Sequence, residues 1–490
     1  MTDNRQASNP TRPQRAEPRD ERIAELEEQL AQAQAEIAEL RQQKAQIHQQ
    51  MAEMVEQVAQ LQQQLEEMER SGKRQATPFG RKKRSANPKK PGRKAGQGTF
   101  KHREKPAEAE VKETKEAPLE SCLECGGELE KRKTHEQFMV DIPPVAPVIT
   151  RFVTHSGHCE QCGKRVRSQH PEQISTATGA AGMVVGPRAK ALAADMKHRL
   201  GISYGKVCEL INDAFGLHVT RGGWCQADQR LAQLARPVYA DLIQVIRAST
   251  VAHVDETGWR IGSLSAWLWV FTNQEVTIYT VADNRSHTVI VDILGQAFEG
   301  ILASDCFTAY DHHKLADWLK QKCVGHLLKN LSDIEDTKSG GAVRFARDVT
   351  ALLRQALVLK AEKPALDPTV FAQRAAALEH RLDQLTDERR RFTDPDNLRF
   401  AKRLRKHRDH LFRFLYVDAL DATNNLAERQ LRPAVITRKT NGCNRTHDGA
   451  ETHAILSSVL VTCRQQSISI VDFLVRLQQF GDQAPSLVPP

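Results

Sequence analysis

A hydrophobic repeat with a period of seven residues constrains the first part of this 490-residue chain. Between Ile23 and Met68, thirteen of the fourteen a and d positions are apolar, and neither Pro nor Gly interrupts the seven heptads. Such a repeat predicts a coiled coil of roughly 70 Å. Lys44, the exception, occupies an a position, where a lysine is tolerated better in a dimer than in a larger oligomer. We therefore predict a polar, disordered stretch over residues 1–19 and a dimerising coiled coil over residues 20–70.

The segment after the repeat is strongly basic and contains several prolines. Between Lys73 and Arg103 there are twelve Lys or Arg and no Asp or Glu, and the prolines prevent a continuous helix. We predict an extended arm and linker over residues 71–120 that contacts double-stranded DNA, in which residues 90–94 could lie in a minor groove. A solvated linker without DNA contacts is the alternative. The basic residues expected to bind DNA are Arg81, Lys82, Lys83, Arg84, Lys89, Lys90, Arg93 and Lys94.

Two pairs of cysteines follow with the spacing of zinc knuckles. Cys122 and Cys125 form one pair, Cys159 and Cys162 form the other, and a glycine comes directly after each pair. Four thiolates complete a closed tetrahedral shell, so we predict one structural Zn²⁺ in a small module over residues 121–170. Strand-like segments at residues 138–142 and 148–154 would form the hairpin that brings the pairs together. A redox-active pair is the alternative, and it fits two matched knuckles less well.

Cysteine content and charge indicate where such a chain works. Without an N-terminal hydrophobic segment, its ten cysteines are expected in a reducing cytoplasm, where thiols bind metal or pack in cores. The longest apolar run, near residues 455–461, is too short to cross a bilayer, so we expect no membrane partner. The net charge of +9 favours a polyanionic partner, and we expect the protein to be associated with the nucleoid.

Residues 171–247 have a helical pattern. One helix is expected from Tyr204 to Phe215, a turn at Gly216, and a second helix after Thr220. This order is typical of a helix-turn-helix DNA-binding unit. A plain helical hairpin that leads into the next domain fits equally well, because Gly222 and Gly223 weaken the second helix.

Three acidic residues further along could meet at one point. Asp255 and Asp305 each follow a short apolar run, at residues 250–254 and 300–304, so both are expected at strand tips. Glu428 lies in a segment that is expected to be helical, which Asn424 or Asn425 could cap. Three carboxylates together would suit Mg²⁺, and two such ions about 3.5–4 Å apart can clamp both reacting oxygens of a phosphoryl transfer. The pattern favours a metal-dependent nuclease or strand transferase.

The order of expected elements around these residues indicates a mixed α/β core. Residues 267–271 and 276–281 are expected to form a hairpin after the first strand, followed by the strand that ends at Asp305, a helix and a short strand. This core would occupy residues 248–330 and 421–490. The charged stretch over residues 331–420 is too long for a loop and is expected to be a helical insertion whose basic residues could contact DNA.

Several segments resemble the bacterial insertion-sequence transposases of the sixty-six family. They are His253-Val254-Asp255-Glu256-Thr257, Asp305-Cys306-Phe307-Thr308-Ala309-Tyr310, the stretch from Asn424 to Pro433 followed by Arg438-Lys439, and the closing residues 449–464. One departure is at residues 325–329, where the family pattern has a His followed closely by an Arg. The resemblance implies a multidomain α/β protein with a ribonuclease-H-like core of the DDE type, preceded by the coiled coil, basic arm and zinc module.

The resemblance also implies an activity and its residues. Asp255, Asp305 and Glu428 would hold two Mg²⁺, water would cut DNA at the element's ends, and the freed 3′-hydroxyl would be joined to target DNA. The partners would be DNA ends, target DNA, a second copy of the chain and any accessory proteins of the element. Two alternatives stay open, a DNA-binding regulator with an inert core and a nuclease that cuts without joining. Near Glu428 the basic residues expected to contact phosphates are Arg429, Arg432, Arg438 and Lys439. Salt bridges within the core are the alternative for these four residues.

Overall fold

The computed structural model describes residues 18–72, 103–130, 133–481 and 486–489. The chain divides after Arg74 into two compact units, which are described separately. Residues 73–102 of the predicted basic arm, which include its eight DNA-binding candidates between Arg81 and Lys94, lie outside the described residues. In the described part of the chain, no helix combines the length and the hydrophobicity needed to cross a bilayer.

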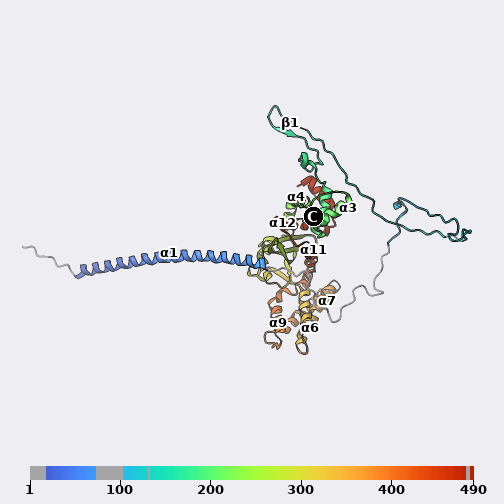
Figure 1. Cartoon of the computed structure of the whole chain (residues 1–490). Coiled ribbons are helices and arrows are strands. Elements are labelled where there is room, and N and C mark those ends of the chain that lie inside the picture. The colour runs from blue at the N-terminus through green and yellow to red at the C-terminus, as the bar shows by residue number, and fades with distance from the viewer. Residues whose placement is uncertain (1–17, 73–102, 131–132, 482–485, 490) are drawn as a thin grey trace, which may run out of the picture. The chain divides into compact units, whose positions relative to one another are not determined.

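The described part of the first unit is a single helix, α1 (Pro18–Gly72), which covers the whole heptad repeat (Figure 1). The helix itself is as predicted. Eight apolar side chains at its a and d positions are 46–59% exposed, so the stripe is open to water along one copy of the chain. Pairing with a second copy stays a prediction. These eight residues are Ile23, Leu26, Leu30, Ile37, Leu40, Ile47, Met51 and Met54.

The described part of the second unit begins with an extended, mostly exposed segment that carries the four knuckle cysteines. Its one strand pair is β1 (Ser156–His158) with β2 (Arg165–Arg167), which are antiparallel and flank the second knuckle. Strands at residues 138–142 and 148–154 were expected, but neither segment pairs with a strand in the described part of the chain. The two segments are separated by Pro143, Pro144 and Pro147, and exposed side chains give them no apolar layer to pack against.

A five-stranded mixed sheet forms the centre of this unit. The strands lie in the order β5-β4-β3-β6-β7. The first three are antiparallel neighbours, and β6 and β7 run parallel to β3. The predicted hairpin is confirmed as β4 and β5, which pair from Thr272 and Thr277 outward. Their bounds are β3 (Val251–Ile261), β4 (Leu264–Thr272), β5 (Thr277–Ala282), β6 (Ile301–Ser304) and β7 (Leu319–Lys322).

Helices cover both faces of the sheet because its strands are apolar on both sides. Ala252 and Val254 of β3 belong to a core shared with α2, α4, α5, α12 and α13, whereas Val251 faces a second core built mainly by α6 to α10. The bounds are α2 (Pro187–Ala194), α4 (Arg221–Arg247), α5 (His287–Leu294), α6 (Val324–Thr337), α7 (Ala342–Glu362), α8 (Pro368–Thr386), α9 (Pro395–Lys406), α10 (Arg413–Tyr416), α11 (Asn425–Asn441), α12 (His447–Gln465) and α13 (Ile470–Phe480).

The helical pair at residues 204–247 begins and ends where its capping residues predict. Helix α3 (Tyr204–Phe215) begins after Ser203 and ends at Gly216, whose φ of 63° is left-handed, and Thr220 caps α4. The 27 residues of α4 pack against α12, α5 and β5. A buried contact between His198 and His453, whose Nδ1 atoms are 3.1 Å apart, also joins this region to α12. The second helix is therefore part of the core, and a DNA-binding role of this helical pair stays a prediction.

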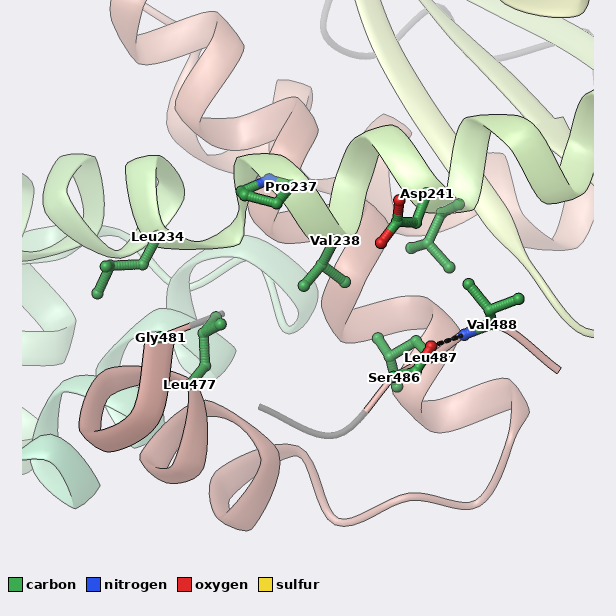
Figure 2. Close-up of a pocket in the computed structure, with 10 residues that line it drawn as sticks. Leu234, Pro237, Val238, Asp241, Leu477, Gly481, Ser486, Leu487 and Val488 are labelled. Carbon is green, nitrogen blue, oxygen red and sulfur yellow. Dashed lines mark hydrogen bonds between the residues drawn. The ribbon is translucent and has the colours of Figure 1, made fainter. Parts of the chain in front are cut away.

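The last described residues return to this helix. Leu487 is buried, and its carbonyl oxygen accepts a hydrogen bond from Gln466 Nε2 at 2.8 Å. Figure 2 shows Val238, Leu477 and Leu487 around a cavity of about 250 Å³ between α4, α13 and this segment.

Candidate active site

The pairing of β3 with β6 places Asp255 beside Asp305. Val251 pairs with Ile301, Ala252 with Leu302 and His253 with Ala303, an offset of fifty residues that carries Asp255 to the level of Asp305. Asp305 is the first residue after β6. Its Oδ1 accepts a hydrogen bond from the backbone N–H of Phe307 at 2.8 Å, and its carbonyl oxygen accepts one from Lys322 Nζ at 3.1 Å. Two bonds thus fix the second aspartate.

Asp255 is not at a strand tip as the sequence suggested. Strand β3 continues to Ile261, because β4 pairs with it along its length, from His253 with Thr272 to Ile261 with Leu264. The parallel partner β6 is much shorter, and its pairing with β3 ends at His253. Asp255 therefore lies where β3 loses its neighbour on one side.

Asn424 fixes the start of α11 to β3. Its Nδ2 donates to the carbonyl oxygen of Val254 at 2.8 Å, and its Oδ1 lies 3.0 Å from His253 Nδ1. Its backbone N–H donates to Cys323 Sγ at 3.1 Å. Asn424 occupies the N-cap position, but its side chain makes no capping bond, so its predicted capping role is wrong. The residue is 1% exposed, and its amide is used by the neighbouring strand.

This attachment places the first turn of α11, which carries Glu428, at the same part of β3 as Asp255. Glu428 follows Asn424 by four residues, so the two lie on the same side of α11, one turn apart. Burial raises the pKa of Asp255 to about 7, and repulsion by the charges of Glu256, Asp305 and Glu428 adds to that rise. The structure thus brings the three predicted carboxylates close enough for their charges to interact.

Little positive charge opposes these carboxylates. Among the described residues, neither Asp255 nor Asp305 forms an ion pair, and the nearest basic partner of Glu428 is His326, with Nε2 3.7 Å from Oε1. Glu428 and His326 each have 37% of the side chain exposed, so the site is open to solvent. Half-buried carboxylates that repel one another are suited to a hard divalent cation, which would neutralise them.

Glu256 belongs to the opposite face of β3. Its Oε1 accepts a hydrogen bond from Arg285 Nε at 2.7 Å, and its Oε2 accepts one from Tyr310 Oη. Arg285 lies between the rings of Trp267 and Phe307, 4.7 and 3.7 Å from their centroids. Both carboxylate oxygens are thus engaged within the core, as expected for a residue that points away from Asp255.

Asp311 and Glu451, two further acidic residues near the predicted site segments, are also paired elsewhere. Asp311 Oδ1 lies 2.9 Å from the Nζ of Lys322, which is fully buried, and Oδ2 lies 2.8 Å from Lys406 Nζ. Glu451 Oε1 lies 2.6 Å from Arg236 Nη1 of α4. The sequence did not suggest the role of Lys322, because a lysine in a short strand resembles an exposed edge residue.

The basic residues of α11 divide into two groups. Arg429, Arg432 and Lys439 are exposed, as expected of residues that contact phosphates. Arg438 is half-buried, and its Nη1 donates to Thr257 Oγ1 at 2.8 Å and to the carbonyl oxygen of Gly258 at 2.6 Å. Arg438 therefore holds α11 against β3, which corrects its expected role as a DNA contact.

Each cysteine pair forms a tight turn, but the structure does not gather the four sulfurs. Gly126 N donates to Cys122 O at 2.9 Å, Gly163 N donates to Cys159 O at 2.8 Å, and both glycines have left-handed φ. Backbone N–H groups of the turns lower the pKa of the Cys122 and Cys159 thiols. In the described part of the chain, the one group of three or more potential ligands within 4.8 Å of one another is Cys323, His326 and Glu428. The four-cysteine zinc site stays a prediction.

Comparison with known proteins identifies the family. The match to an uncharacterized protein y4qI of Sinorhizobium fredii (strain NBRC 101917 / NGR234) has 23% identity over 235 residues, 43% of this chain and 42% of that protein's length. The sequence model of the Transposase IS66 family matches residues 182–452, more than half of the chain, and this span includes Asp255, Asp305 and Glu428. The chain belongs to the IS66 family of transposases.

Proposed function

We propose that this transposase cuts DNA at the ends of an insertion sequence and joins the resulting 3′-hydroxyl to target DNA, with Asp255, Asp305 and Glu428 holding two Mg²⁺. The observation that carries the proposal is the β3–β6 register that sets Asp255 level with Asp305, together with the attachment of α11 that brings the helix of Glu428 to the same part of β3. Among the described residues, none of the three carboxylates forms an ion pair with a Lys or Arg. The strand order β5-β4-β3-β6-β7 also supports a ribonuclease-H-like core. The catalytic carboxylates would come from two neighbouring strands and one helix.

The donor set fits magnesium. Asp255, Asp305 and Glu428 offer hard oxygen ligands, and a few carboxylates together with substrate phosphate oxygens are its usual ligands. When bound, two such ions supply charge neutralisation and activation of the attacking and leaving oxygens. The chain's own residues position these ligands. Asn424 sets the distance between α11 and β3, while Lys322 and the N–H of Phe307 hold the Asp305 loop.

Basic residues of two segments would bind the DNA backbone. Arg429, Arg432 and Lys439 are exposed on the helix that carries Glu428. The basic arm predicted over residues 71–120 would add further contacts to phosphates. Dimerisation through the apolar stripe of α1 would bring two copies of the site to one complex. One Zn²⁺ bound by Cys122, Cys125, Cys159 and Cys162 would order the segment between the arm and the core. We place this activity at the bacterial nucleoid.

Purified protein incubated with Mg²⁺, a labelled element end and a target plasmid tests the proposal against its two alternatives. Joined product supports the transposase, cutting without joining supports a nuclease, and binding without cutting supports a regulator with an inert core. We expect Asp255→Asn and Glu428→Gln to lower the cleavage rate by at least ~10²–10³-fold, because each removes an anionic ligand of the cations that would neutralise the reacting phosphate.

The matched control is Glu451→Gln, since Glu451 is a carboxylate of α12 that pairs with Arg236 on the surface. It should cut and join at a rate close to that of the unaltered chain. All variants should retain DNA affinity, because the contacts to phosphates come from other residues. Full joining activity of Asp255→Asn would show that the three carboxylates are not the catalytic group.

A further inference from the structure

Next to the three carboxylates lies a group of ligands of a different chemical kind. Cys323 follows β7 directly, and its backbone N–H donates to Ser304 O at 2.8 Å, so it continues the pairing of β7 with β6. His326 lies in the first turn of α6. One ligand atom from each of Cys323, His326 and Glu428 lies within 4.8 Å of the others. The group therefore combines sulfur, nitrogen and oxygen donors at one edge of the sheet.

We propose that Cys323, His326 and Glu428 form a binding site for a thiophilic divalent cation of the Zn²⁺ class, and that occupation of this site withdraws Glu428 from the magnesium ligands. The second half of the proposal rests on the proposed function, whereas the binding site itself does not. A metal of this class would thus inhibit the transposase by competing for one carboxylate.

The spacing of the three side chains suits such an ion. Tetrahedral Zn²⁺ binds nitrogen and oxygen at about 2.0–2.2 Å and sulfur at about 2.3 Å, which places its ligand atoms roughly 3.3–3.8 Å apart. His326 Nε2 and Glu428 Oε1 are already 3.7 Å apart. Small side-chain rotations would bring all three donors into range. The exposed side of His326 and Glu428 gives the ion an entry path and leaves room for a water as fourth ligand.

The surroundings of the sulfur also suit a thiolate ligand. Cys323 is 2% exposed, and its Sγ accepts a hydrogen bond from the backbone N–H of Asn424 at 3.1 Å. An N–H donor to a ligating sulfur orients it and stabilises its negative charge. The side chain of Asn424 also fixes α11 to β3. The backbone bond from Asn424 to Cys323 therefore keeps this cysteine in contact with the start of the helix that carries Glu428.

The chemistry of the donors separates this site from the magnesium site. Magnesium prefers oxygen ligands and gains little from a thiolate or an imidazole, so it would leave Cys323 and His326 unused. Zinc, cobalt and cadmium bind sulfur and nitrogen strongly. Glu428 is the one side chain that both sites require. Thiophilic cations at low concentration should therefore inhibit even when Mg²⁺ is in large excess.

Cobalt is the direct probe, because Co²⁺ bound to a thiolate gives a charge-transfer band in the near ultraviolet. The full-length chain and its Cys323→Ser and His326→Ala variants are titrated with Co²⁺. The knuckle cysteines are present in every sample, so the difference between spectra reports the new site. Cys208→Ser, which removes a thiol of α3 outside the site, is the matched control. We expect one cobalt equivalent and its band to be lost in Cys323→Ser and retained in Cys208→Ser.

A second measurement tests the inhibition. Zn²⁺ is titrated into the Mg²⁺-dependent cleavage reaction, and each variant is compared with its own zinc-free rate. We expect Cys323→Ser to raise the half-inhibitory zinc concentration by at least ~10–100-fold. Removal of a residue that only supports a metal ligand already weakens metal binding by about this factor, and Cys323 would be a ligand itself. Cys208→Ser should be inhibited like the unaltered chain.

The outcomes separate the two proposals. Identical cobalt spectra and identical zinc inhibition in Cys323→Ser and the unaltered chain would overturn the site, and His326 with Glu428 would then be a simple ion pair. If Cys323→Ser fails to fold by circular dichroism, Glu428→Gln decides, since loss of a ligand must weaken cobalt binding. A cobalt site in a chain that shows no Mg²⁺-dependent cleavage would leave the metal site standing and reject the proposed function.

Discussion

Replacement of Asn424 by Ala tests whether the attachment of α11 to β3 builds the site. The side chain makes two buried contacts, to Val254 O at 2.8 Å and to His253 Nδ1 at 3.0 Å. Ala would leave both partners buried without a hydrogen bond, at about 1–3 kcal/mol each. We therefore expect the free energy of unfolding to fall by about 2–6 kcal/mol. The backbone bond from Asn424 to Cys323 can remain, so the helix should loosen at its start without unfolding completely.

Two measurements check this prediction. Amide hydrogen exchange over residues 425–441 reports local opening of α11, and Mg²⁺ binding reports the position of Glu428. Asn425→Ala is the matched control, because Asn425 is an exposed asparagine at the next position. We expect fast exchange and weakened Mg²⁺ binding in Asn424→Ala only. Equal exchange rates and equal Mg²⁺ affinity in the two variants would refute the claim that Asn424 positions the third carboxylate.

Three further predictions follow from the contacts around the site. The folded-state pKa of Asp255, about 7, lies above its unfolded value, so the folded chain binds this proton more tightly. Stability without divalent ions should fall as pH rises toward 7, by at most ~1.4 kcal/mol per pH unit. Asp255→Asn should remove this pH dependence of stability, measured by urea unfolding in the presence of a chelator. An unchanged pH dependence in the variant would contradict the raised pKa of Asp255. Arg432→Ala should lower the salt dependence of DNA binding by about one phosphate contact. Arg438→Ala, which loses its bonds to β3, should mainly lower thermal stability. The reverse pattern would show that Arg438 contacts DNA and that Arg432 supports the fold. Glu256→Ala should lower the free energy of unfolding by roughly 3 kcal/mol, which is the lower end for a broken buried ion pair because Arg285 is one-third exposed. If the additional change Arg285→Met restores the unfolding midpoint, the unpaired cation is the cause of the destabilisation.

Local sequence signals predicted several elements because short-range chemistry determines them. The β4–β5 hairpin follows from two apolar runs around a polar turn, and Ser203, Gly216 and Thr220 delimit α3 and α4 through their own capping geometry. The three carboxylates were candidates from sequence because Asp255 and Asp305 come directly after short apolar runs and Glu428 lies near the start of a segment with a helical pattern. Their gathering could not be read from spacing alone, since it depends on the register of β3 with β6.

Other features depend on tertiary contacts that leave no local signal. Asn424 has the sequence position of a capping residue, yet its side chain donates a hydrogen bond to the backbone of β3. Arg438 resembles a surface cation, yet it bonds to the backbone of β3. Asp255 resembled a strand end because the apolar run stops there, but the hairpin partner β4 extends the strand beyond it. In each case, a distant strand offered a better partner than solvent.

Contacts around Asp311 connect the helical segment to the Asp305 loop. Lys406, at the end of α9, pairs with Asp311, which also pairs with the buried Lys322. Lys322 in turn donates to the backbone of Asp305. A buried ammonium needs both of these acceptors, so any movement of α9 that draws Asp311 away would leave Lys322 with one strong partner and disturb the Asp305 loop. The helices inserted between β7 and α11 therefore do more than cover the sheet, because their position is coupled through two ion pairs to one of the proposed catalytic carboxylates.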